Sequence, residues 1–273
     1  GRMAGKPKTA AAQPCWFRGV FTSGLPFRNK KGRMMKLSHN RAVLLMVMVT
    51  LMWSTAGVVT RHLESARSFE GTFWRAFFTV ASLSLLLPWV SGKAVFRNTL
   101  RAGRSFWLSA VCWSVMFTAF MVALTLTTVG NVLVTMSMGP LLTAIIARVF
   151  IGHTIPKRTW VAVWVAGAGI VYMYASQLGS VSLAGTLVAL CVPLAGATNW
   201  TVTQHAHDQG HDVDLMPAVW AGGLISCVAT LPLALPLQAT GHDVLLLGFL
   251  GVFQLAVPCV LSVRCAQILK APE

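Results

Sequence analysis

Acidic residues are scarce in this chain, and their scarcity argues against an ordinary soluble fold. Only 7 of the 273 residues are Asp or Glu, and all charged residues together make up 11% of the chain, whereas a soluble domain is about a quarter charged. Hydrophobic residues make up 55%, and the mean hydropathy is +0.67. This balance predicts an integral membrane protein.

The sequence also lacks a C-x-x-C motif, which argues against a zinc ribbon or a redox pair. The six cysteines fall mostly inside apolar runs, where cysteine serves as a small apolar packing residue. We therefore expect no metal site, no cofactor and no disulfide framework.

Eight long apolar runs take up most of the chain after residue 36. Each has roughly 18 to 25 residues, enough for a helix to cross a hydrocarbon core of roughly 30 Å. Helices are expected because an unpaired backbone amide in lipid is costly, and such apolar runs lack the alternation of a membrane barrel. The predicted fold class is all-α integral membrane, with spans at residues 42–60, 72–90, 105–125, 131–151, 159–176, 183–203, 215–237 and 244–268.

Basic residues are numerous, but their positions indicate a bilayer rather than nucleic acid. Ten of the 22 Lys and Arg lie before Ala42, and most of the others flank apolar runs. Residues 1–36 are basic and broken by Pro and Gly, so we expect a disordered or non-native extension. Loops rich in Lys and Arg alternate with poorer loops over the first five runs. This pattern predicts a multi-pass inner (plasma) membrane protein with a cytoplasmic N-terminus.

One shift of the sequence indicates an internal repeat between the two halves of the chain, with chance similarity between apolar runs as the alternative. When the chain is aligned with itself so that His205 matches His62, the stretch "TVTQH" aligns with "VVTRH". The same offset aligns Ala266 with Ala123. Related halves are common among transporters, and a unit with an odd number of spans inverts its copy. We therefore expect a first five-helix repeat at 37–176 and an incomplete second repeat of three helices at 177–273.

Several stretches carry a resemblance to a known family. They are "LMWSTAGVVTRHL", "FWRAFFTVASLSLLLP", "VALTLTTVGNVLVTMSMGPLLTAIIARVFIG" and "VAVWVAGAGIVYM". In order and spacing, residues 37–273 resemble the EamA-like family of the drug/metabolite transporter superfamily. The resemblance implies ten helices in two inverted five-helix repeats, a central substrate site and alternating access. The chain departs from the family pattern at Ser54-Thr55, at His153 and in lacking the last two helices.

Polar residues within the runs are candidates for a substrate pathway. Arg75 would lie near the outer face, where the positive-inside rule does not explain a cation, although it could also snorkel to the headgroups. Asn131 and Asn199 could instead form hydrogen bonds between helices, and Trp53 could pack against lipid or another helix. Pro140, Pro193 and Pro258 are expected to interrupt helices, and Pro140 also matches the resemblance. The predicted pathway residues are Trp53, Arg75, Asn131, Pro140 and Asn199.

No Asp or Glu falls inside the predicted spans, whereas proton-coupled antiporters usually hold a carboxylate at membrane depth. We therefore expect facilitated or exchange transport, and Arg75 suits an anionic or zwitterionic metabolite. The segment "QHAHDQGHDVD" from Gln204 could hold a metal or sense pH, but a solvated loop is the simpler interpretation.

The predicted function is an inner-membrane permease or exporter of a small metabolite. We predict no enzymatic activity and no catalytic residues, since only the His/Asp loop resembles the acid and His cluster that a lipid-modifying enzyme needs. A membrane scaffold or a non-functional truncated fragment is the main alternative. The expected partners are a lipid bilayer and a small-molecule substrate, with a homodimer left open and no nucleic acid.

Overall fold

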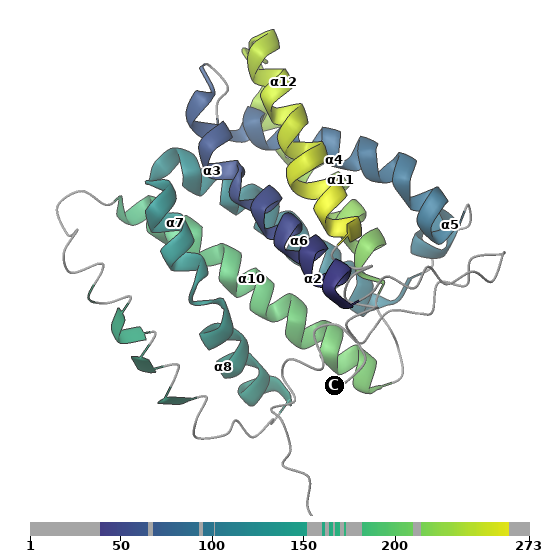
Figure 1. Cartoon of the computed structure of the whole chain (residues 1–273), viewed down its shortest axis with the longest axis vertical. Coiled ribbons are helices and arrows are strands. Elements are labelled where there is room, and N and C mark those ends of the chain that lie inside the picture. The colour runs from purple at the N-terminus through teal and green to yellow at the C-terminus, as the bar shows by residue number, and fades with distance from the viewer. Residues whose placement is uncertain are drawn as a thin grey trace, which may run out of the picture.

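The computed structural model describes residues 39–64, 68–92, 95–100, 102–151, 182–209 and 214–261, together with scattered positions between 160 and 172. Every regular element in this part of the chain is a helix (Figure 1). The α-helices are α2 (His39–Ser54), α3 (Ala56–Val59), α4 (Ser68–Ser91), α5 (Val95–Leu100), α6 (Arg104–Leu126), α7 (Val129–Met136), α8 (Gly139–Ile151), α10 (Leu183–Asp208), α11 (Leu215–Ala234) and α12 (Gly241–Phe249). A 3₁₀ turn, η1 (Thr60–His62), extends α3, and a π-helix, η2 (Leu250–Ala256), continues α12.

Six helical stretches are long and apolar enough to cross a membrane: Val43–His62, Arg104–Leu126, Val129–Phe150, Leu183–Ala206, Leu215–Ala234 and Gly241–Leu261. These confirm the predicted all-α membrane class. Helix α4 has 24 residues, long enough to span, but it is not one of the six. The predicted fifth span, 159–176, falls mostly outside the described residues. The count of eight spans therefore stays a prediction.

Two helices begin earlier than predicted, and this corrects the expectation that no acidic residue lies in a span. Helix α4 begins at Ser68 and α12 at Gly241, so Glu70 and Asp243 lie in their first turns. The start of α12 is fixed by a cap, because the Thr240 hydroxyl accepts a hydrogen bond from the Asp243 backbone N–H at 3.2 Å. The spacing Thr-x-x-Asp is a helix-start signal that hydropathy alone overlooks.

Two predicted spans are interrupted. Near Thr55, between α2 and α3, the hydroxyls of Ser54 and Thr55 donate to carbonyls three residues back, each at 2.7 Å, and such back-bonding competes with the helix ladder. Helix α7 ends at Met136 and α8 begins at Gly139, immediately before Pro140. Proline lacks an N–H and is tolerated at a helix start. The expectation that Pro193 interrupts its helix is wrong, since α10 continues through it.

The core forms where small residues let helices approach closely. Helix α6 packs between α10 and α11, and α4 packs on α11 and η2. Gly222 of α11 lies so close to α6 that a Cβ there would stand 2.7 Å from the Ala110 carbonyl oxygen. Small residues at helix crossings are typical of membrane proteins, where close packing replaces the hydrophobic drive.

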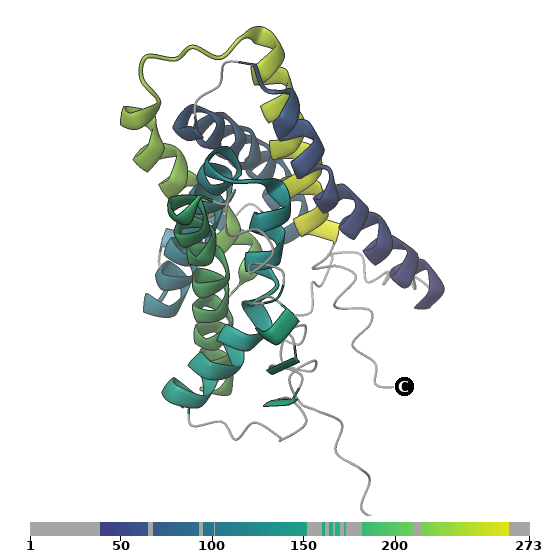
Figure 2. The same cartoon turned by 90° about the vertical axis from the view of Figure 1, so that its left-hand side faces the viewer.

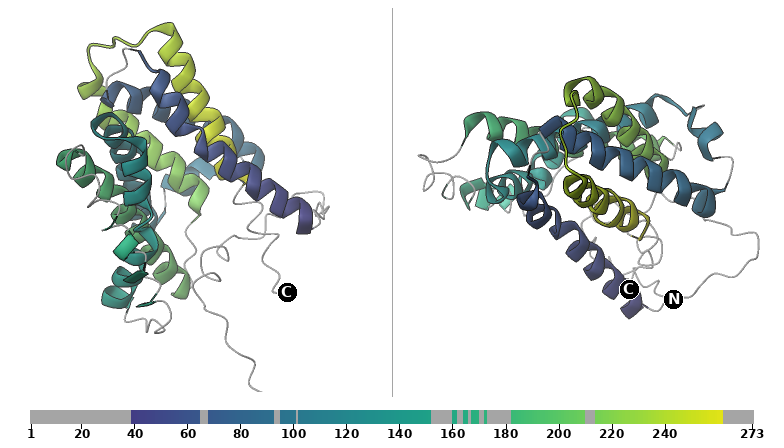
Figure 3. Two further views of the ribbon diagram at one scale, coloured as in Figure 1. Left: turned by 60° about the vertical axis from the view of Figure 1, so that its left-hand side comes forward. Right: turned by 90° about the horizontal axis from the view of Figure 1, so that it is seen from above.

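Helix α2 is among the least covered of these elements. Its N-terminal part, purple in the figures, projects away from the other helices (Figures 2 and 3). Within the protein, 11% of the most apolar window of Val43–His62 is buried, against 50% for Leu215–Ala234. A largely apolar helix with this exposure needs lipid or further protein around it.

Candidate functional site

Arg75 lies in the protein interior, where α4 meets α6 and η2. Its side chain is 4% exposed, so it does not reach the protein surface as a snorkelling arginine would. Its Nη2 donates a hydrogen bond to Gln254 Oε1 at 3.0 Å. The guanidinium carbon lies 5.3 Å from the Phe120 ring centroid and 6.0 Å from that of Phe117. Aromatic faces stabilise a buried cation.

The backbones of α4 and η2 are in direct contact around Arg75. The Thr79 hydroxyl lies 2.8 Å from the Arg75 carbonyl oxygen and 3.2 Å from that of Gly251. A Cβ on Gly251 would come within 2.8 Å of the Arg75 carbonyl oxygen. Gln254 lies on the π-helix, a geometry that recurs at functional sites. A lone Gln in the apolar stretch "GVFQLAVP" was the available sequence signal, and the sequence analysis missed it.

The guanidinium is left with unused donors. Arg75 Nε and Nη1 have no hydrogen-bond partner among the residues that the structure describes. A buried charged group without its hydrogen bonds is costly. Within the described part of the chain both atoms thus lack an acceptor, and guanidinium has the fork of donors that matches an anion.

Two more residues of α4 have buried polar atoms without partners. Glu70 is 0% exposed; its Oε1 accepts hydrogen bonds from the backbone N–H groups of Gln238 and Ala239, at 2.9 and 2.7 Å. Its Oε2 and the indole Nε1 of Trp74 have no partner within the described part of the chain. The stretch 70–75 thus holds four of the five such atoms found there.

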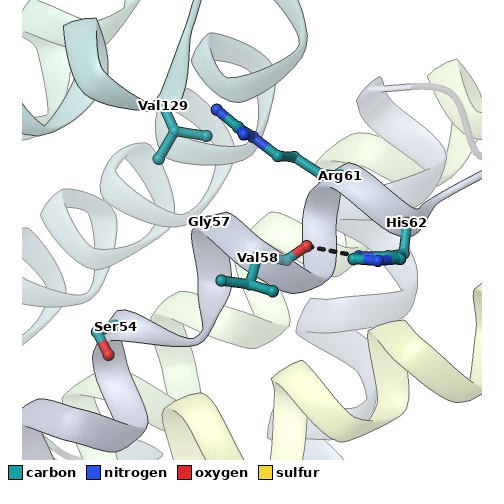
Figure 4. Close-up of a pocket in the computed structure, with 6 residues that line it drawn as sticks. All are labelled: Ser54, Gly57, Val58, Arg61, His62 and Val129. Carbon is teal, nitrogen blue, oxygen red and sulfur yellow. Dashed lines mark hydrogen bonds between the residues drawn. The ribbon is translucent and has the colours of Figure 1, made fainter.

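A cavity of about 380 Å³ lies between the first predicted span and α7. Arg61 extends from η1 across it toward Val129 (Figure 4). His62 donates from Nδ1 to the Val58 carbonyl oxygen at 2.9 Å. The volume falls within the usual range for small-molecule sites. The lining residues are Ser54, Gly57, Val58, Arg61, His62 and Val129.

The two predicted asparagines join helices. Asn131 Nδ2 donates to the hydroxyls of Thr127 and Thr186, both at 2.9 Å, and the second bond links α7 to α10. Asn199 Oδ1 accepts from the Ser109 hydroxyl at 2.6 Å, which links α10 to α6. These contacts are helix–helix hydrogen bonds of the kind that membrane bundles use.

Replacing Asn199 tests how much such a bond contributes. Asn199→Leu fills a similar volume and removes the acceptor of Ser109, so we expect a stability loss of about 1 kcal/mol. Thermal unfolding in detergent would measure this loss, with Ser109→Ala as the partner variant. The two variants combined should cost little more than either alone; additive losses would show that Asn199 and Ser109 do not act as a pair.

The predicted pathway residues do not share one cavity. Trp53, 41% exposed, precedes Ser54 of the cavity, and Asn131 follows Val129 by two residues, but neither lines it. Arg75 and Asn199 also lie outside that lining, as does Pro140. The cavity therefore lies at Arg61, whereas Arg75 lies in the protein interior, outside the cavity lining.

A metal centre has no support in the described residues, where no three His, Cys, Asp or Glu side chains gather. The segment 204–214 is only partly described. Its last residue, Asp214, caps α11 by accepting from the Met216 backbone N–H at 3.3 Å. Burial raises the pKa of Asp214, and the bond from Met216 opposes that rise.

Comparison with known proteins adds one match. Residues 40–175 match the sequence model of the EamA-like transporter family. The matched stretch begins in α2, runs past α8 and includes Arg75, whereas Gln254 lies beyond it. No curated protein and no solved structure matches the chain.

Proposed function

Through residues 40–175 the chain belongs to the EamA-like transporter family, and we propose that it carries a small anionic or zwitterionic metabolite across the inner membrane by alternating access. The family assignment supports a membrane transporter. The substrate class, the membrane and the mechanism are the parts that we propose.

The buried guanidinium of Arg75 carries the proposal on substrate class. Two of its nitrogens lack partners among the described residues, and no salt bridge to Arg75 occurs in that part of the chain. A carboxylate with two acceptor oxygens would satisfy these donors with charge-assisted hydrogen bonds. Because Arg75 is buried, the site is closed in this state. Alternating access would open it to one side at a time.

The helix contacts support two inverted repeats. If α2–η1, α4 and α6 correspond to α10, α11 and α12–η2, each contact between the halves should have a counterpart. The contact between α11 and α6 has its counterpart in the contact between α4 and η2. The contact between α10 and α6 has its counterpart in the contact between α2 and η2. The contact of α10 with α8 would need a ninth helix on the exposed face of α2. Two repeats of five helices make ten, and this is the arrangement that we propose. The alternation of basic loops in the sequence is the ground for proposing a cytoplasmic N-terminus.

Flux across proteoliposomes tests the function. The full-length native protein would be reconstituted and assayed for counterflow of three labelled probes: succinate as an anion, alanine as a zwitterion and tetraphenylphosphonium as a lipophilic cation. We expect saturable exchange of succinate, alanine or both, above that of protein-free liposomes. Exchange of the cation alone, or of none of the three, would contradict the proposal.

A further inference from the structure

We propose that the buried carboxylates of Glu70 and Asp243 form a latch that closes the carrier on the side where α4 and α12 begin. The latch must open before a substrate can enter from that side. The inference rests on the proposed function, because it describes one of the two gates that alternating access requires. The observation that carries it is reciprocal, since each carboxylate holds the backbone of the segment that leads into the other carboxylate's helix.

The two halves of the latch are built in the same way. Glu70 lies in the first turn of α4, and its Oε1 accepts from the backbone N–H groups of Gln238 and Ala239, before α12, at 2.9 and 2.7 Å. Asp243 lies in the first turn of α12, and its Oδ1 accepts from the backbone N–H of Glu64, before α4, at 2.9 Å. Both carboxylate side chains are 0% exposed. Because a buried carboxylate that loses such bonds is costly, each one holds the opposite segment in place.

The latch lies at one end of a long contact between the two predicted halves. Helix α4 contacts both α12 and η2, and Figure 2 shows the end of η1 and the start of α12 at the same end of the molecule. Glu64 with Asp243, and Arg75 with Gln254, are both 179 residues apart, so the two segments run side by side in the same direction. Leu247, 0% exposed, lies between Asp243 and Gln254 along this contact. The latch therefore holds the halves together at the end of the contact that leads to Arg75.

The contact between α6 and α11 has no corresponding latch among the residues that the structure describes. These helices also pack closely, and the hydroxyl oxygens of Thr118 and Ser226 lie 2.9 Å apart. At the start of α11, however, the carboxylate of Asp214 accepts from Met216 of its own helix. Because α6 is the span that returns after α4, its start lies at the opposite side of the membrane. An interaction that differs between the two sides can bias a carrier toward one of its two states, here the state closed at the start of α4. Under the proposed orientation, that side is the outer one.

Labelling of an engineered cysteine tests the latch without any substrate. In a cysteine-free form of the full-length protein in nanodiscs, Leu247→Cys reports whether water reaches the contact between α4 and α12. Glu70→Leu removes the acceptor of Gln238 and Ala239 at similar volume, whereas Glu70→Gln keeps a carbonyl oxygen there and is the matched control. A charged methanethiosulfonate should label the Glu70→Leu variant roughly ten times faster than the Glu70→Gln variant, because the closed state loses its hydrogen bonds. Asp243→Leu and Asp243→Asn form a second pair with the same expectation. Equal rates within either pair would overturn the proposal.

A cross-link tests the same claim with both carboxylates in place. The exposed side chains of Glu64 and His242 lie 3.9 Å apart, from Oε1 to Nδ1. Glu64→Cys and His242→Cys combined, once joined by a short bifunctional methanethiosulfonate, should stop exchange of succinate and alanine in proteoliposomes, and a reducing agent should restore it. Each single variant treated with the same reagent is the control and should keep its exchange. Exchange by the cross-linked protein at the native rate would overturn the latch while leaving transport intact. Absence of exchange in the native protein would instead count against the proposed function, and the labelling rates would still decide whether the latch exists.

Discussion

Arg75→Gln should lower carboxylate transport about 10- to 100-fold. A hydrogen bond to a charged group contributes about 1.5–3 kcal/mol, and each 1.4 kcal/mol is about a factor of ten. Glutamine keeps a polar side chain next to Gln254, so the loss reports on charge and fork geometry. Initial rates of succinate and alanine exchange would measure it. Arg75→Lys keeps the positive charge but lacks the planar fork of donors. Its exchange rates should therefore lie between those of the native protein and those of Arg75→Gln.

A matched control separates the site from a general loss of positive charge. Arg148 of α8 is exposed and lies 5.8 Å from the Trp160 ring centroid. Arg148→Gln also removes one positive charge, but from an exposed residue that does not contact Gln254. Because exposed charges contribute little, we expect exchange rates within about twofold of those of the native protein. Carboxylate exchange that survives Arg75→Gln at the native level would contradict the assignment of Arg75 to the substrate site.

Gly222→Ala should destabilise the fold by about 1–3 kcal/mol, the usual cost of overpacking. The added Cβ would stand 2.5 Å from Trp113 Cβ and 2.7 Å from the Ala110 carbonyl oxygen. Because one of these atoms is backbone, α11 and α6 must move apart. The measurement is thermal or denaturant unfolding of the purified protein in detergent.

Gly130 provides the control for this substitution. It also lies in a helix, α7, but a Cβ there would meet nothing within 4 Å. Alanine is the better helix former by about 1 kcal/mol, so Gly130→Ala should be neutral or stabilising. Equal losses for the two variants would mean that the contact of α11 with α6 does not limit stability.

Hydropathy predicted the spans well because lipid imposes a simple rule on length and polarity. Runs 105–125 and 183–203 correspond to α6 and α10. The rule fails at helix ends, where capping sets the boundary and a polar residue can be buried by protein instead of exposed to water. Glu70 and Asp243 illustrate this, since both looked like loop residues and both lie buried in first helical turns.

The site was less predictable than the spans. Arg75 stood out in the sequence because a charge within an apolar run demands a reason. Its partner Gln254 is 179 residues away, a distance across which spacing carries no information. Asn131 and Asn199 were equally conspicuous, and the structure gives each a hydrogen bond to a neighbouring helix. Polarity in a span therefore indicates a constraint, and only the contacts show whether it concerns packing or a ligand.

The most direct test of the account is a through-space coupling between substrate and Arg75. Solid-state NMR on proteoliposomes would measure the dipolar coupling from the ¹³C-labelled carboxylate of an exchanged probe to ¹⁵N-labelled arginine side chains. The account predicts a coupling in the native protein that disappears in Arg75→Gln and remains in Arg148→Gln. Exchange of the probe without that coupling, or a coupling that persists in Arg75→Gln, would contradict it.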